Sequence, residues 1–208
     1  EESIQRYFLE SRTNVTSVYA ERSEHNTIQN YINNENSCHP LIVIGESGSG
    51  KSSLLAHAIK DYEEQEDSCV VLYCFIGISD ESSTDYQLIR FLNKSLALKI
   101  ADFEQKKLEQ GQQVNLELRL ENFESVSILE QSYDGLCKLF IRRLETLAQY
   151  IKVIIFLDAV DQLVLDSGLE FIPNYLKNIR IIVSTLPEWQ AKYVKLFKLR
   201  IMTSEHGQ

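Results

Sequence analysis

Glycine placement constrains this chain of 208 residues more than any other feature. Only 8 residues are glycine, where average usage would give about 15. Three of these 8, Gly45, Gly48 and Gly50, lie close together, directly after the run Leu41–Ile44. That run is apolar at every position, which is typical of a strand buried on both faces of a parallel sheet. From Ser52 to about Glu64 apolar residues recur at helical spacing, so the stretch predicts a strand, a glycine loop and a helix.

The glycine loop predicts a phosphate-binding site, because it matches G-x-x-x-x-G-K-[ST] at every fixed position. A backbone that wraps a phosphate needs unusual φ and ψ angles and no Cβ at close approach, and glycine provides both. The helix N-terminus adds its positive dipole. Lys51 would reach the β- and γ-phosphates, and the Ser52 hydroxyl would coordinate Mg²⁺. We expect the nucleotide to contact Gly45, Glu46, Ser47, Gly48, Ser49, Gly50, Lys51, Ser52 and Ser53.

Two aspartates extend the expected site. Asp158 follows the apolar residues 153–157, which predict another buried strand, so we expect its carboxylate to hold the Mg²⁺ shell. Asp161 would either orient the attacking water or cap a short helix, and the sequence leaves both roles open. Ser184 and Thr185 end a further strand, where a hydroxyl would either contact the γ-phosphate or be an ordinary strand-end group. The candidate catalytic residues are therefore Lys51, Asp158 and Asp161.

Strands alternate with helices along the chain, which predicts an α/β fold with a mainly parallel, five-stranded sheet flanked by helices. An opening helix would bury Ile4, Tyr7, Phe8 and Leu9 on one face. Further strands are expected at residues 69–76, 178–185 and 198–202, and further helices at 23–33, 84–100 and 128–150. We divide the chain into a helical lead-in, 1–36, and a core, 37–208. A polar helical insertion near 101–127 is either solvated or a contact surface for another domain.

Composition and charge narrow the possible partners and the cellular compartment of the protein. The net charge of −9 and the pI of about 5.0 disfavour general nucleic-acid binding. No apolar run approaches the ~20 residues of a membrane helix, and the first residues do not form a signal peptide. The four cysteines form no C-x-x-C pair and are interpreted as buried thiols in a reducing compartment. We expect a cytoplasmic protein, and the missing initiator Met indicates a piece of a longer chain.

Together these motifs resemble those of STAND-type P-loop NTPases of the NACHT group, within the ASCE class. The similarity is greatest to domains of nephrocystin-type and telomerase-associated scaffold proteins and their prokaryotic relatives. It rests on residues 45–55, on 155–163 with their spaced aspartates, and on 182–187. Residues 20–24 are similar to the G-R-E-x-E segment that opens such domains near the adenine, which makes Arg22 a candidate nucleotide contact.

The resemblance implies a function and a strand order. It implies ATP as the nucleotide, slow hydrolysis, and a switch role in a larger signalling, scaffold or defence protein with repeats and an effector. It is compatible with nucleotide-dependent oligomers. It also implies that the Thr185 strand lies between the strand before the glycine loop and the Asp158 strand.

Two departures from the family pattern keep other functions open. Glu21 precedes Arg22 where the family has glycine, and Leu186 stands where many relatives carry an arginine. A nucleotide-binding domain that does not hydrolyse is therefore one alternative. A small-molecule kinase is another, although residues 101–127 carry only Arg119 and offer no arginine-rich lid. A GTPase is disfavoured because residues 93–96 lack the aspartate of N-K-x-D, and a transporter ATPase because L-S-G-G-Q does not occur.

Overall fold

The structure, a computed structural model, describes residues 1–13, 23–37, 39–65, 68–112, 132–163, 171–173, 177–189 and 200–203. Its helices are α1 (Glu2–Thr13), α2 (Ser23–Asn33), α3 (Lys51–Glu63), α4 (Asp85–Glu109) and α5 (Tyr133–Leu147). Its strands are β1 (Leu41–Ile44), β2 (Cys69–Phe75), β3 (Lys152–Asp158), β4 (Ile179–Thr185) and β5 (Arg200–Thr203). Short 3₁₀ helices follow three of the strands: η1 (Asp80–Ser82), η3 (Val160–Gln162) and η4 (Pro187–Trp189).

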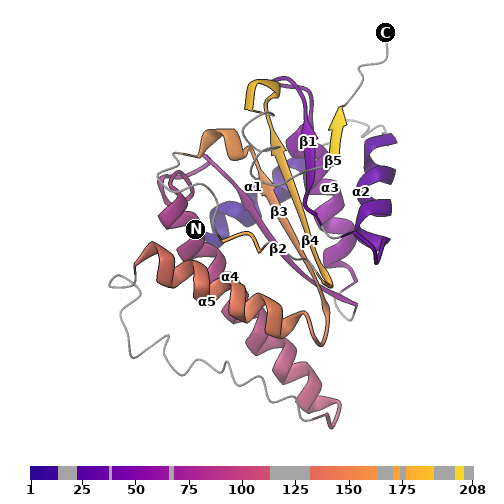
Figure 1. The fold of residues 1–208 in the computed structure, drawn as a ribbon, viewed down its shortest axis with the longest axis vertical. Helices are drawn as coiled ribbons and strands as arrows, with labels where there is room; N and C mark the ends of the chain where they lie inside the picture. The colour runs from indigo at the N-terminus through magenta and orange to yellow at the C-terminus, as the bar shows by residue number, and fades with distance from the viewer. Residues whose placement is uncertain are drawn as a thin grey trace.

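A parallel sheet forms the centre of the fold (Figure 1). Strands β1 to β4 lie in the order β2-β3-β4-β1, and β5 runs parallel to the far edge of β1. The predicted α/β class, with a parallel sheet flanked by helices, is confirmed. The strand that ends at Thr185 lies between β1 and β3, as the family resemblance implies. Its last residue is in register with Ile44, so the ends of these strands are adjacent.

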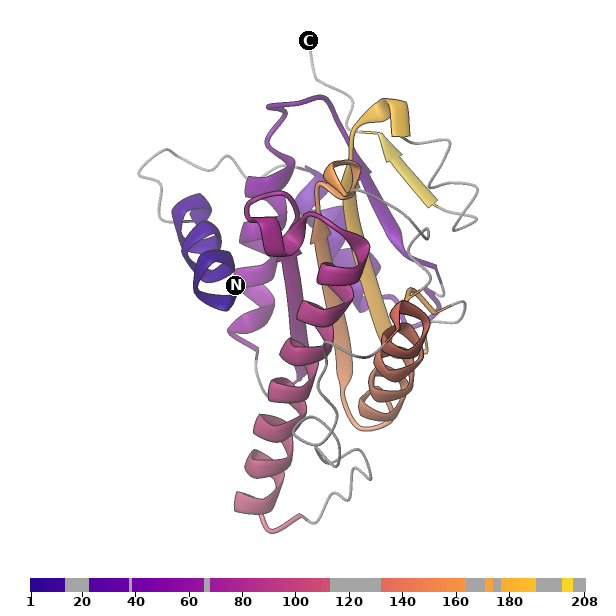
Figure 2. The ribbon, with the colours of Figure 1, turned by 90° about the vertical axis from the view of Figure 1, so that its left-hand side faces the viewer.

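Helices bury both faces of this sheet (Figures 1 and 2). Helices α4 and α5 cover one face, and α1, α2 and α3 cover the other. This explains the uniformly apolar strands, because successive side chains point to opposite faces and both faces are core. In β3, for example, Val153, Ile155 and Leu157 pack towards α4 and α5, whereas Ile154 and Phe156 pack towards α3.

Two helices begin where the sequence predicts. Helix α2 has the expected bounds, and α4 begins after Thr84, whose hydroxyl accepts a hydrogen bond from the Gln87 N–H. Helix α4 does not end near Ile100, however, because Phe103 is still packed in the core and the helix continues to Glu109. Residues 113–131, which hold most of the expected insertion and the start of the last predicted helix, lie outside the described residues.

The apolar face predicted for α1 is buried only in part, since Leu9 and Phe8 pack in the core. Ile4 and Tyr7 are 46% and 74% exposed, while Gln5 and Leu9 are buried. The Gln5 carboxamide bonds both main-chain groups of Phe75 in the edge strand β2. Its Nε2 donates to the carbonyl at 3.1 Å, and its Oε1 accepts from the N–H at 2.7 Å. Gln5 therefore does there what a neighbouring strand would do, and this need for a partner sets which face of α1 is buried.

Two expectations, on the cysteines and on membrane helices, can be compared with the described part of the chain. Cys69, Cys74 and Cys137 are buried free thiols, as predicted, and burial raises the pKa of Cys69 and Cys74. Cys38 lies outside the described residues. Among the helices that the structure describes, none combines the length and the apolar character that crossing a membrane requires.

Replacing Gln5 by alanine tests whether its side chain supplies the hydrogen bonds that a neighbouring strand would supply. The change leaves the Phe75 N–H and carbonyl without partners in a buried setting, which should lower the free energy of unfolding by about 1–3 kcal/mol. Urea denaturation measures this. Gln105→Ala, on an exposed part of α4, is the matched control and should change stability by less than about 0.5 kcal/mol. Equal effects of the two changes would contradict the assignment.

Candidate functional site

The glycine loop connects the carboxyl end of β1 to the N-terminus of α3. Gly48 and Gly50 have φ angles of 76° and 89°, in the left-handed region that glycine adopts readily. Gly50 is the N-cap of α3 and supplies no side-chain hydrogen bond, so the N–H groups of the first turn have no side-chain cap. A helix N-terminus of this kind suits an anion. The loop thus has the backbone geometry that its sequence predicts.

Lys51 lies back across this loop. Its Nζ donates to the carbonyl oxygens of Gly45 at 2.6 Å and Glu46 at 2.9 Å. Gly45 itself is buried, whereas Glu46, Ser47 and Gly48 are exposed. The only positive charge of the loop is therefore held against the main chain of Gly45 and Glu46, beside the first turn of α3.

Asp158 brings the second half of the site to the loop. It ends β3, is only 4% exposed, and accepts a hydrogen bond from the Ser184 hydroxyl, while the Ser52 hydroxyl lies near enough to lower its pKa. Burial is the largest influence on this carboxyl group and raises its pKa above the usual range. The hydroxyl groups of Ser184 and Ser52 and the charge of Lys51 oppose that shift, and the nearby charge of Asp161 adds to it. The predicted metal ligands Ser52 and Asp158 thus lie near each other.

Asp161 lies in η3, just beyond β3. The N-cap of η3 is Ala159, so Asp161 does not cap this short helix. Its Oδ1 instead accepts a hydrogen bond from the Leu186 N–H at 3.2 Å, and its Oδ2 accepts one from Gln162 Nε2 at 2.8 Å. Asp161 therefore ties the loop after β3 to the end of β4.

Thr185 lies beside the glycine loop. It is fully buried, and its carbonyl oxygen accepts a hydrogen bond from the Gly45 N–H at 3.4 Å. Its Oγ1 has no hydrogen-bond partner among the described residues. Leaving a buried hydroxyl without a partner is unfavourable, and such groups call for an explanation such as a ligand.

Ser184, which the sequence singles out only as a possible γ-phosphate contact, instead bonds Asp158 and the chain that follows it. Its Oγ donates to Asp158 and accepts from the Ala159 N–H at 2.8 Å. The available signal was a hydroxyl directly after the apolar run 181–183, but its partners lie at and just after the end of β3, far away in the sequence. Arg22, the expected contact near the adenine, lies outside the described residues.

The oxygen groups at this site fit a magnesium ion held jointly with phosphates. Mg²⁺ is usually bound by one or two protein oxygens together with substrate phosphates and water. Ser52 and Asp158 supply a hydroxyl and a carboxylate of this kind. Within the described ranges there is no group of three or more His, Cys, Asp or Glu side chains that could hold a metal.

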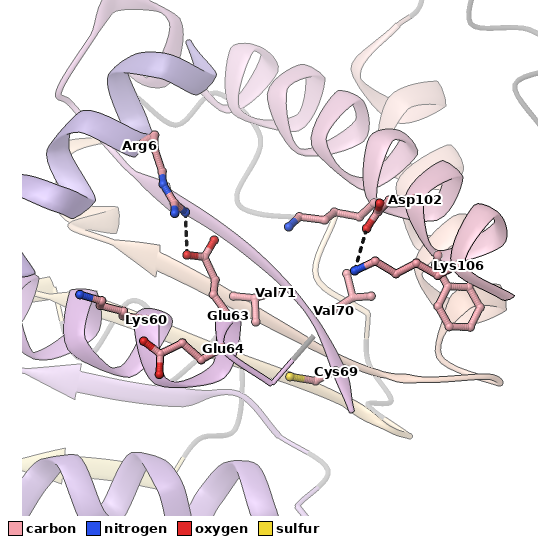
Figure 3. A pocket seen from close by; sticks show the side chains of 11 residues that line it. Arg6, Lys60, Glu63, Glu64, Cys69, Val70, Val71, Asp102 and Lys106 are labelled. Carbon is pink, nitrogen blue, oxygen red and sulfur yellow. Dashed lines mark hydrogen bonds and ion pairs between the residues drawn. The ribbon is translucent and has the colours of Figure 1, made fainter. Parts of the chain in front are cut away.

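A separate groove follows the edge strand β2 (Figure 3). It has a volume of about 440 Å³ and lies at the beginning of β2, away from the strand ends that carry Asp158. Ion pairs line its walls, Arg6 with Glu63 at 2.7 Å and Lys106 with Asp102 at 3.5 Å. The groove is therefore separate from the candidate site.

The fold and site define an α/β protein with a glycine loop and a buried aspartate at the same end of a parallel sheet. The family model described as Nephrocystin 3, N-terminal matches residues 21–195, which is well over half of the chain. The chain therefore belongs to this nephrocystin 3 N-terminal family, and the predicted nephrocystin-type relationship is confirmed. A comparison with curated proteins found no match.

Replacing Asp158 by asparagine should stabilise the fold. Asparagine keeps the shape and can still accept from Ser184, but it removes a charge that burial makes unfavourable. We expect the free energy of unfolding at neutral pH in metal-free buffer to rise by about 1 kcal/mol. Urea denaturation checks this, with the exposed Asp102→Asn as control. A large loss of stability would show that the carboxylate serves the fold itself.

Proposed function

We propose that this chain binds ATP with Mg²⁺ and hydrolyses it slowly, as a STAND-type NTPase domain of the NACHT group. The observation that carries the proposal is the closeness of Ser52, at the start of α3, to Asp158, at the end of β3. The bond from Ser184 to Asp158 and the bond from the Gly45 N–H to Thr185 bring these strand ends to the glycine loop. Ser52 and Asp158 are the two positions that the motifs assign to the metal, and they come from distant parts of the sequence. A five-stranded ASCE-type sheet, with β5 beside β1, is part of the proposal.

Each residue of the site has a role in this proposal. The loop N–H groups and Lys51 bind the phosphates, so Lys51 exchanges its carbonyl partners for phosphate oxygens. Ser52 and Asp158 hold Mg²⁺, which neutralises charge on the β- and γ-phosphates when bound. Thr185 supplies a hydroxyl to the γ-phosphate. Asp161 orients the attacking water after it leaves the Leu186 N–H.

One observation favours a second candidate, a domain that binds ATP without hydrolysing it. Both carboxylate oxygens of Asp161 already accept hydrogen bonds, from Leu186 and Gln162. Leu186 also provides no positive charge at the position where many relatives have arginine. Release of phosphate without any acceptor distinguishes slow hydrolysis from binding alone and from a small-molecule kinase, whereas turnover that needs an added metabolite indicates the kinase.

The proposal extends to the setting of the domain. It would act in the cytoplasm as the nucleotide-dependent switch of a longer signalling, scaffold or defence protein. Its partners would be other domains of that chain, such as repeats and an effector, and further copies in a nucleotide-dependent oligomer.

The first test is Lys51→Ala. Removing a charged donor from the phosphates should weaken binding of a fluorescent ATP analogue by at least about tenfold, while thermal unfolding stays cooperative. Lys60→Ala, on the exposed face of the same helix, is the matched control and should bind like the wild type. Unchanged affinity in the Lys51 variant would remove the basis of the proposal.

The second test is Asp161→Asn. If Asp161 orients water, ATP affinity should stay within about twofold while phosphate release slows by about 10²-fold or more. Asn can still accept from the Leu186 N–H, so the tie to β4 is kept. A single-turnover phosphate assay measures the rate. Turnover equal to that of the wild type would restrict Asp161 to its structural contact with Leu186.

A further inference from the structure

Ser184 joins two strands through one fully buried hydroxyl. Its Oγ donates to Oδ1 of Asp158 on β3 and accepts from the Ala159 N–H. A serine hydroxyl has a single proton to donate, so that proton is committed to the carboxylate. Ser184 is therefore more than an ordinary strand-end residue.

The bond to Ala159 fixes how the chain leaves β3. Ala159 has φ 56° and ψ 49°, a left-handed conformation that is uncommon for a residue with a Cβ and costs about 1–2 kcal/mol. Its N–H points to Ser184, so β4 stabilises this conformation. The same turn directs the chain into η3 and brings Asp161 to the Leu186 N–H. Two contacts from the end of β4 thus hold the loop that follows Asp158.

The bond to Asp158 fixes the carboxylate itself. Ser184 donates a hydrogen bond to it from β4, and the Ser52 hydroxyl lies nearby at the start of α3. A carboxylate held by a neighbour loses rotational freedom before it meets a metal, so less is lost on binding. Groups that orient a metal ligand in this way are worth about 10–100-fold in metal affinity.

We propose that Ser184 is a positioning residue that holds the Asp158 carboxylate in place for the Mg²⁺–nucleotide complex. This inference rests on the proposed function. Because Ser184 directly precedes Thr185, it also connects the metal ligand to the strand end that would contact the γ-phosphate. A shift of the end of β4 would then move the carboxylate as well.

The test separates magnesium from nucleotide. Binding of mant-ATP is measured in EDTA and over a Mg²⁺ titration for the wild type and for Ser184→Ala, Ser184→Thr and Ser82→Ala. Ser82→Ala is the matched control, since Ser82 is also a fully buried serine but bonds the Ser79 carbonyl. In Ser184→Ala we expect the half-saturating Mg²⁺ concentration to rise at least about tenfold, with affinity in EDTA within about twofold of the wild type. Ser184→Thr retains the hydroxyl and should restore the Mg²⁺ dependence, and Ser82→Ala should leave it unchanged.

Each other outcome overturns a defined claim. An unchanged Mg²⁺ dependence in Ser184→Ala overturns the positioning role and leaves nucleotide binding intact. An equal loss of affinity with and without Mg²⁺ shows a purely structural role. Absence of binding by the wild type overturns the proposed function and this inference with it. If Ser184→Ala does not fold, Ser184→Cys replaces it, because the thiol is similar in size but a weak donor, and the same Mg²⁺ shift is expected.

Discussion

Burial of the sheet on both faces is the constraint from which the rest of the structure follows. Helices cover each face, so a polar side chain within an inner strand would need a buried partner, and strands β1 and β3 are apolar almost throughout. Polar groups are then confined mainly to the strand ends. Asp158, Ser184 and Thr185 all lie at carboxyl ends, on the side where the glycine loop leaves β1. Open α/β sheets bind ligands at this edge. Burial of both faces of the sheet therefore explains both the apolar core and the position of the site.

The same burial makes Asp158 unfavourable as a charged group. Its pKa is raised mainly by loss of solvent, and the hydroxyl groups of Ser184 and Ser52 together with the charge of Lys51 only oppose this effect. A buried carboxylate with such a balance contributes little to folding, since well-packed apolar residues usually stabilise an interior at least as well. In the proposed function, its neighbours keep this acidic group in place for a cation. Unfavourable groups of this kind are expected at functional sites.

The sequence predicted the features that follow from patterns along the chain. It missed the features that depend on contacts between residues far apart in the sequence. Uninterrupted apolar runs located β1 and β3, and the loop motif located Gly48 and Gly50, because burial and backbone geometry leave local traces. Asp161 was different, since its contact with Leu186 joins residues far apart in the sequence and no spacing reveals it. Part of the buried face of α1 was missed for a related reason. Apolar periodicity favoured Ile4 and Tyr7, whereas Gln5 is buried to satisfy the main chain of Phe75.

Helices α1 and α2 each provide a side chain that hydrogen-bonds the main chain of the sheet. These bonds indicate where the domain begins. Gln5 pairs with Phe75 in β2, and the Tyr31 hydroxyl lies 3.2 Å from both the N–H and the carbonyl oxygen of Ile181, just before β4 meets β1. Gln5 supplies both hydrogen bonds that a strand would supply. The Tyr31 hydroxyl accepts from the Ile181 N–H, and its single proton points between the carbonyl oxygens of Ile181 and His39. A core that began at residue 37 would leave both strands with unpaired groups. The family match begins at residue 21, so it includes Tyr31 but not Gln5. By its hydrogen bonds, the folding unit reaches further towards the N-terminus than the matched region, and α1 belongs to it.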